Sequence, residues 1–134
     1  MPFHTRSHGV DVGALQRGIE KATALASAAG LDVIYLLPTF ANADGDALVA
    51  LIGKHAAETF KKNREATING VRFHMETALK KRVSGPAIVL AMNVSLEQLA
   101  KAQTDHRTAD LVYITWSDVE LEQYEAANPG SVAI

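Results

Sequence analysis

Polar and aromatic side chains suited to binding a small molecule follow three apolar runs of the sequence. The runs are residues 33–37, 87–92 and 111–114. The residues that follow them are Asn42, Asp44, Asp46, Asn93, Ser95, Thr115, Trp116 and Ser117. If the runs are parallel strands, their carboxyl ends meet at one edge of a sheet, and these side chains share a crevice there. Free amides at helix N-termini would favour an anion such as a phosphate, and the indole of Trp116 could stack on a base or ring.

Three of these residues also have a purely structural explanation. Asp46, Ser95 and Ser117 each precede an apolar-periodic segment, where a side-chain oxygen caps the free amides of a helix. Asp44 and Asp46 resemble the DxD pairs that bind metals in phosphoryl-transfer sites, although Asn-Ala-Asp-Gly-Asp is also ordinary turn chemistry. Since no carboxylate on another strand end completes the pair, the sequence assigns no metal and leaves the cofactor unknown.

The histidines offer weaker alternatives. His74 and Glu76 alternate on one face of a predicted strand and form a conceivable acid–base pair, but solvent-facing strand polarity is the simpler interpretation. His4 and His8 are four residues apart, yet their segment has no helix pattern and no acidic third ligand.

Two basic clusters stand against one acidic segment. The clusters are Lys61, Lys62 and Arg64, and Lys80, Lys81 and Arg82, while the acidic residues are Asp118, Glu120, Glu122 and Glu125. Solvated helix ends explain the clusters, and the opposition of charge can also guide self-association or partner docking. Nucleic acid is not an expected partner, because the clusters lack interleaved aromatic residues and the chain is net negative.

Familiar catalytic motifs are missing from the sequence. It contains neither GxGxxG after the first run nor the phosphate-loop motif GxxxxGK[ST]. It also lacks the GxSxG elbow of α/β-hydrolases and the HExxH zinc motif. The sequence therefore leaves open whether the protein is an enzyme.

Composition sets the broad class. A chain of 134 residues with 48% hydrophobic and 21% charged residues fits one globular domain. The absence of cysteine excludes disulfides and thiol nucleophiles, and it is compatible with the cytoplasm, which is the expected location. Residues 1–10 lack the apolar core of a signal peptide, and no apolar run approaches the length of a membrane span, so no membrane association is expected.

The first half of the chain predicts helix, strand, helix. Apolar residues recur with helical period over residues 11–29, with Asp11 as the N-cap and Gly30 as the residue that ends the helix. The continuous apolar run at 33–37 predicts a strand buried on both faces. After a polar loop, residues 47–64 predict one long helix that begins at Asp46.

The second half of the chain continues the alternation. Asn69-Gly70 indicates either a hairpin turn or the end of the preceding helix, and it is followed by a predicted strand over 71–75 and a short helix over 77–82. The runs at 87–92 and 111–114 predict buried strands. Ser95 with Gln98, and Ser117 with Glu120, match capping boxes that begin the next two helices.

These elements predict a single α/β domain over residues 1–134. We expect three α/β/α layers around a mainly parallel sheet of three to five strands. The layout has a Rossmann-like or flavodoxin-like look, which does not fix function. Residues 1–9 are expected to be a flexible N-terminus and residues 131–134 a short tail. The alanine-rich first helix has a second apolar flank, so a homo-oligomer is also expected.

Two functions remain open at this stage. The first is a non-catalytic ligand-binding or protein-interaction module that takes a nucleotide-like or anionic ligand at the carboxyl edge of the strands. The second is a small enzyme that acts on a nucleotide or phosphorylated metabolite, with assistance from a metal at Asp44 and Asp46.

Overall fold

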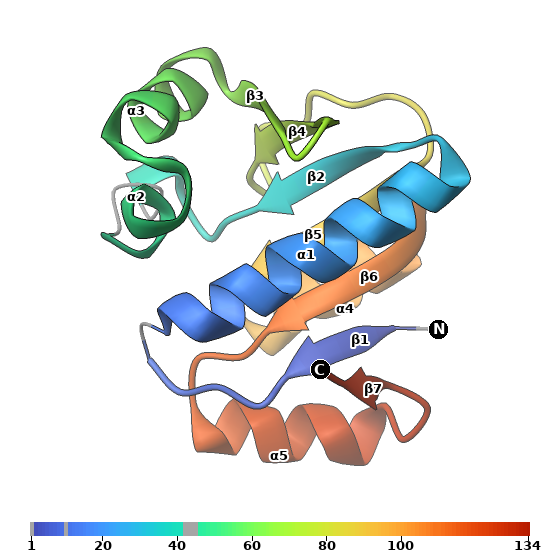
Figure 1. Ribbon diagram of the computed structural model, residues 1–134. Helices are drawn as coiled ribbons and strands as arrows, with labels where there is room; N and C mark the ends of the chain where they lie inside the picture. Colours follow the sequence, from blue (N-terminus) through green and yellow to red (C-terminus); the bar gives the residue numbers. More distant parts are fainter. Residues whose placement is uncertain (1, 10, 42–45) are drawn as a thin grey trace.

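The structure, a computed structural model, describes residues 2–9, 11–41 and 46–134 (Figure 1). The strands are β1 (Phe3–Thr5), β2 (Asp32–Leu36), β3 (Glu65–Ile68), β4 (Val71–Glu76), β5 (Ala87–Met92), β6 (Thr108–Ile114) and β7 (Val132–Ala133). The helices are α1 (Val12–Ala29), α2 (Asp46–Ile52), α3 (Lys54–Asn63), α4 (Leu96–Thr104) and α5 (Asp118–Ala127). The strands form one sheet in the order β3-β4-β2-β5-β6-β1-β7. All neighbouring strands are parallel except β3 and β4, which confirms the predicted α/β class.

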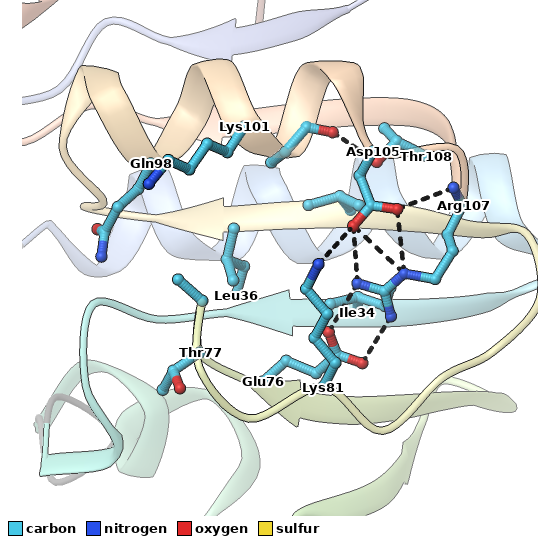
Figure 2. Close-up of a pocket in the computed structure, with 13 residues that line it drawn as sticks. Ile34, Leu36, Glu76, Thr77, Lys81, Gln98, Lys101, Asp105, Arg107 and Thr108 are labelled. Atoms are coloured by element: carbon cyan, nitrogen blue, oxygen red, sulfur yellow. Dashed lines mark hydrogen bonds and ion pairs between the residues drawn. The ribbon is translucent and has the colours of Figure 1, made fainter.

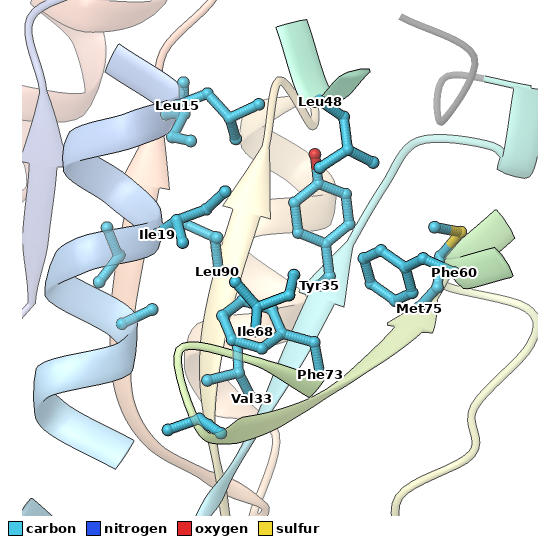
Figure 3. Packing of buried hydrophobic residues seen from close by; sticks show 14 of the residues in the cluster. Leu15, Ile19, Val33, Tyr35, Leu48, Phe60, Ile68, Phe73, Met75 and Leu90 are labelled. Carbon is cyan, nitrogen blue, oxygen red and sulfur yellow. The ribbon is translucent and has the colours of Figure 1, made fainter. Parts of the chain in front are cut away.

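The helices cover the two faces of the sheet. Side chains of β2 alternate between the faces, so Val33 and Tyr35 join a core with α1, α2 and α3, whereas Ile34 and Leu36 join a second core with α4 and α5. Figure 3 shows the first core, in which Phe60 of α3 packs against the ring of Tyr35 with centroids 5.7 Å apart. Both cores are apolar, which explains the continuous apolar runs of the central strands.

The packing of α1 on the sheet depends on a close approach of the helix backbone to side chains of β5 and β6. Gly18 is buried in α1, and a Cβ atom at this position would lie 2.9 Å from Cδ1 of Ile114 and 3.2 Å from Cδ1 of Leu90. The predicted stripe is buried at Leu15, Ile19, Ala22 and Ala26, while Ala29 is exposed. Gly18 is therefore the contact point of α1 with β5 and β6.

Short local patterns fix the helix ends as predicted. The Asp11 carboxylate accepts a hydrogen bond from the Ala14 N–H, and Gly30 ends α1 in the left-handed conformation with φ 68°. Ser95 and Gln98 form the reciprocal capping box that begins α4. At the start of α5, Ser117 accepts from the Glu120 N–H, but the predicted capping box is only half formed, because Oε1 of Glu120 is buried without a hydrogen-bond partner among the described residues.

The single helix predicted over residues 47–64 is wrong. Gly53 has φ 87° and ψ 159°, so it breaks the segment into α2 and α3. The change of direction lets Leu48 and Phe60 both reach the first core, where they are 3% and 0% exposed. A straight helix presents one stripe only, and glycine is the residue that adopts this φ without strain.

The hairpin over Asn69-Gly70 is confirmed, but the helix predicted over residues 77–82 is not formed. Residues 77–86 instead cross over β2 without a helix and connect β4 to β5. Backbone hydrogen bonds between Thr77 and Lys80 make only a local turn. We name residues 77–86 the crossover segment.

The sheet is wider than the predicted three to five strands, because both ends of the chain join it. The segment expected to be flexible contains β1, whose residues pair in parallel with Val112, Tyr113 and Ile114 of β6. The expected tail contains β7, which pairs with β1. Both strands are too short to show a pattern, and β1 buries the polar residues His4 and Thr5, which are 2% and 0% exposed. None of the helices in the described part of the chain is long and apolar enough to cross a membrane.

Candidate functional site

A groove lies between α4 and the crossover segment, on the face of the sheet that α5 also covers (Figure 2). Its lining comprises Ile34, Leu36, Glu76, Thr77, Ala78, Lys81, Val89, Gln98, Lys101, Ala102, Asp105, Arg107 and Thr108. No helix follows β4 directly, so β2 is covered on this face by an irregular segment, and that leaves room beside α4. The groove therefore follows from the missing crossover helix.

Glu76 fixes one wall of the groove. Its side chain is 1% exposed, and its carboxylate accepts from both terminal nitrogens of Arg107, at 3.0 and 3.1 Å. The same carboxylate accepts from the backbone N–H groups of Arg82 and Val83, each at 2.8 Å. The interpretation of Glu76 as a solvent-facing strand residue is wrong, because the crossover segment covers this end of β4. Glu76 ties that segment to the sheet.

Arg107 joins the crossover segment to the chain between α4 and β6. Besides Glu76 it donates to the Val83 carbonyl at 2.6 Å and to both carboxylate oxygens of Asp105. The Arg107 hydrogen bonds hold the pKa of Asp105 well below its usual range. Every nitrogen of the guanidinium is engaged within the protein, so Arg107 supports the groove and its donors are already used.

Two lysines on opposite walls carry the freer charges. Nζ of Lys81 is 3.5 Å from Oδ2 of Asp105, and its side chain is 59% exposed. Nζ of Lys101 on α4 is 3.9 Å from Oε1 of Glu97, and its side chain is 72% exposed. Exposed pairs at such separations are weak. Because Arg107 already pairs Glu76 and Asp105, the described lining carries one positive charge in excess.

The groove has a narrow apolar part and a wide polar part. The narrow part lies over Ile34, Leu36 and Val89 and has a volume of about 80 Å³. Liquid water takes about 30 Å³ per molecule, so this part holds only a few heavy atoms. The wide part has a volume of about 450 Å³ and adds Val83, Ser84, Thr104 and His106 to the lining. The shape suits a ligand with a small apolar end and a larger polar end.

The eight residues predicted from the strand ends have several separate environments. Asn42, Asp44 and the side chain of Asp46 lie outside the described residues, although α2 begins at Asp46. Of the other five, Ser95 and Ser117 are helix caps. None of these five lines the groove. The lining residue that lies nearest to them along the chain is Gln98, in the first turn of α4.

Thr115 and Trp116 lie where the loops after β6 and β1 meet. Thr115 is fully buried, and its hydroxyl accepts from the Ser7 N–H and lies 3.0 Å from the Thr5 carbonyl oxygen and 2.9 Å from that of Ser7, which share its one proton. The Trp116 carbonyl accepts from the Gly9 N–H, and its side chain is 45% exposed. These hydrogen bonds join the loop after β6 to the loop after β1, so the edge of the sheet at the carboxyl ends of these two strands is closely packed.

Asn93 has a different setting from the other four. It lies after β5 with φ 56°, and its N–H donates to the Ile114 carbonyl. Its Oδ1 atom is buried without a hydrogen-bond partner among the described residues. A buried acceptor of this kind stores a modest free-energy cost.

The working side chains of the groove were largely missed in the sequence. Arg107 and Asp105 lie in a polar loop, and Lys101 lies on a helix face with no motif around it. Lys81 belongs to one of the basic clusters of the sequence, and Glu76 stands out there only as a neighbour of His74. The missing information is the pairing of Glu76 with Arg107, which are far apart in the chain and meet only after β5 and β6 are in place.

A titratable cluster around His4 joins the ends of the chain to α5. His4 contacts Ser131 Oγ at 2.8 Å and Glu125 Oε2 at 2.9 Å, which ties β1 to α5 and the start of β7. The hydrogen bond from His4, with help from Arg6, lowers the pKa of Glu125. In the described part of the chain, no three histidine or acidic residues are grouped as a metal site would need.

Comparison with known proteins adds no relative to this picture: no protein family, no curated protein and no solved structure matches the chain.

Proposed function

We propose that the protein is a non-catalytic binding module whose groove takes a small organic anion. The ligand class is a carboxylate or phosphate carried on a short apolar group. The observation that carries the proposal is the pair of lysines, Lys81 and Lys101, on opposite walls above an apolar floor. An anion between them would gain two charge-assisted contacts, while its apolar group would cover Ile34 and Leu36.

The engagement of the acidic residues supports binding rather than acid–base chemistry. Glu76 and Asp105 are the carboxylates of the described lining, and both are held by Arg107. A general base needs a carboxylate or imidazole that is free to take a proton near the ligand. Here the arginine pairs both carboxylates, so their role is to shape the wall. The imidazole of His106 is 88% exposed and does not line the narrow apolar part.

The proposal predicts that affinity depends on both ends of the ligand. Titration calorimetry would compare straight-chain carboxylates of increasing length, the matching alkyl phosphates, and the neutral amides. Each buried methylene contributes about 0.8 kcal/mol, or roughly fourfold in Kd, until the narrow part is full. The neutral amides are expected not to bind.

The lysine contribution is tested with a matched pair of variants. Lys101→Gln is expected to weaken anion binding by about tenfold, since one charge-assisted contact contributes about 1.4 kcal/mol. Lys62→Gln removes an exposed lysine on α3 across the sheet and is expected to leave Kd unchanged. Equal binding by wild type and Lys101→Gln, or equal binding of acids and amides, would contradict the proposal.

A further inference from the structure

One exposed patch lies at the tip of the crossover segment. Leu79 is 92% exposed, and Lys80 and Arg82 beside it are also exposed. The tip is held in shape, because Thr77 and Lys80 exchange backbone hydrogen bonds and the Arg82 N–H donates to the buried carboxylate of Glu76. We name Leu79, Lys80 and Arg82 the basic tip. Lys81 turns towards Asp105 and belongs to the groove instead.

A second patch lies on the outer face of α5. Val119 is 63% exposed, and the Asp118 side chain is 82% exposed. Glu122 is also exposed and lies one helical turn beyond Asp118, while Tyr124 on the other side of the helix is buried. We name Asp118, Val119 and Glu122 the acidic face.

The two patches cannot meet within one molecule. The crossover segment lies over β2, between β4 and β5, whereas α5 leads from β6 to β7 at the other end of the sheet (Figure 1). Both are on the same side of the sheet, with α4 between them. Any contact between the basic tip and the acidic face must therefore join two molecules.

We propose that the protein associates with itself head to tail, with the basic tip of one copy docked on the acidic face of the next. The patches are complementary in two respects. Each has one large exposed apolar side chain, Leu79 or Val119, and each surrounds it with two charges of one sign. Pairing them covers both apolar groups and places Lys80 and Arg82 opposite Asp118 and Glu122.

The geometry predicts an unusual mode of growth. A contact between two different patches leaves one free patch at each end, so a dimer can add further copies, unlike a closed two-fold dimer. Exposed charges contribute to the contact, so association weakens as salt is added. This inference does not depend on the ligand proposal, because it uses none of the groove lysines.

Sedimentation velocity and light scattering would test the mode of association. Wild-type protein at high concentration and low salt is expected to exceed the monomer mass of 14.4 kDa, with an average mass that keeps rising with concentration. The mass is expected to fall towards that of the monomer as salt rises to about 1 M, where the Debye length of about 3 Å is no longer than the contacts between the charges. A wild-type protein that stays monomeric at low salt would overturn the inference.

Complementary variants give the sharper test. One variant carries Leu79→Ser, Lys80→Ser and Arg82→Ser, and the other carries Asp118→Asn, Val119→Ser and Glu122→Gln. Each alone is expected to be monomeric, with melting temperature checked to show that it is folded. An equimolar mixture keeps one intact pair of patches and is expected to form dimers that grow no further.

A control variant with Lys54→Ser and Lys62→Ser changes exposed lysines elsewhere and is expected to associate like wild type. Two outcomes would overturn the inference. One is a mixture of the complementary variants that remains monomeric. The other is a single variant that still associates, which would locate the contact elsewhere, for example on the outer flank of α1.

Discussion

Replacing Arg107 by methionine is expected to lower the free energy of unfolding by about 3–5 kcal/mol at neutral pH. Methionine fills much of the same space, so the main loss is electrostatic. The Glu76 carboxyl group, which is 1% exposed, would lose the guanidinium that pairs it. The Val83 carbonyl would also lose its donor, which loosens the crossover segment. Urea unfolding of both proteins measures the difference.

The cost of the Arg107 substitution is expected to depend on pH. Arg107 holds the pKa of Asp105 below its ordinary value of 3.8. A carboxylate whose pKa is depressed by folding stabilises the native state above its unfolded pKa, and this contribution is lost as pH falls towards the folded pKa. The variant lacks this contribution, so the difference in unfolding free energy between wild type and variant should stay constant near neutral pH and narrow as the pH falls through and below 3.8. A gap that widens in acid would contradict this account.

A control variant at Lys81 tests whether the destabilisation by the Arg107 substitution comes from the lost pairing with Glu76 or from a general loss of positive charge. Lys81→Met removes a cation whose side chain is 59% exposed and whose contact with Asp105 is 3.5 Å long. Exposed pairs contribute about 0–1 kcal/mol, so this variant should remain close to wild type. A loss as large as that of the Arg107 variant would mean that the burial of Glu76 is not the cause.

Gly18→Val is expected to destabilise the protein by about 1–3 kcal/mol. The first added carbon alone would lie 2.9 Å from Cδ1 of Ile114, so α1 must move away from the sheet or Ile114 must change rotamer. Both neighbours, Ile114 and Leu90, are buried and have little room to give way. The loss of stability is measured as a lower urea concentration at the midpoint of unfolding.

Two further variants test whether contact with the sheet is the cause. Ala24→Val places the same side chain at an exposed position of α1 and should cost only the helix propensity, about half a kcal/mol. Combining Gly18→Val with Ile114→Ala makes room for the new methyl groups, so the double variant should lose less than the sum of the two single losses. Strict additivity would argue against a clash at this contact.

Local sequence patterns predicted the centre of the fold because they act over a few residues. The apolar runs of β2 and β5, the Asn69-Gly70 turn and the capping residues Asp11 and Ser95 all specify structure without distant partners. Such patterns also explain why the three-layer arrangement could be predicted before the pairing of any strand was known.

The remaining features depend on contacts between distant residues. The break at Gly53 is favoured only because α2 and α3 must both reach the same core. The helix predicted after Thr77 does not form, because the Glu76 carboxylate accepts hydrogen bonds from the N–H groups of Arg82 and Val83. The groove could not be predicted from the sequence for the same reason, because its wall forms only when Arg107 pairs with Glu76. The strand-end residues proposed as a site from the sequence remain a prediction.

The position of β1 has a consequence for synthesis on the ribosome. β1 is made first among the strands, yet its parallel partners are β6 and β7, which are made last. The face of α1 that meets Ile114 and Val112 likewise waits for β6. Pairings of such long range are slow to form, because a long loop must close before they contribute. While the chain is being translated, its first strand and the part of α1 that packs on β6 stay uncovered, and the emergence of β6 is the event that allows the sheet to close.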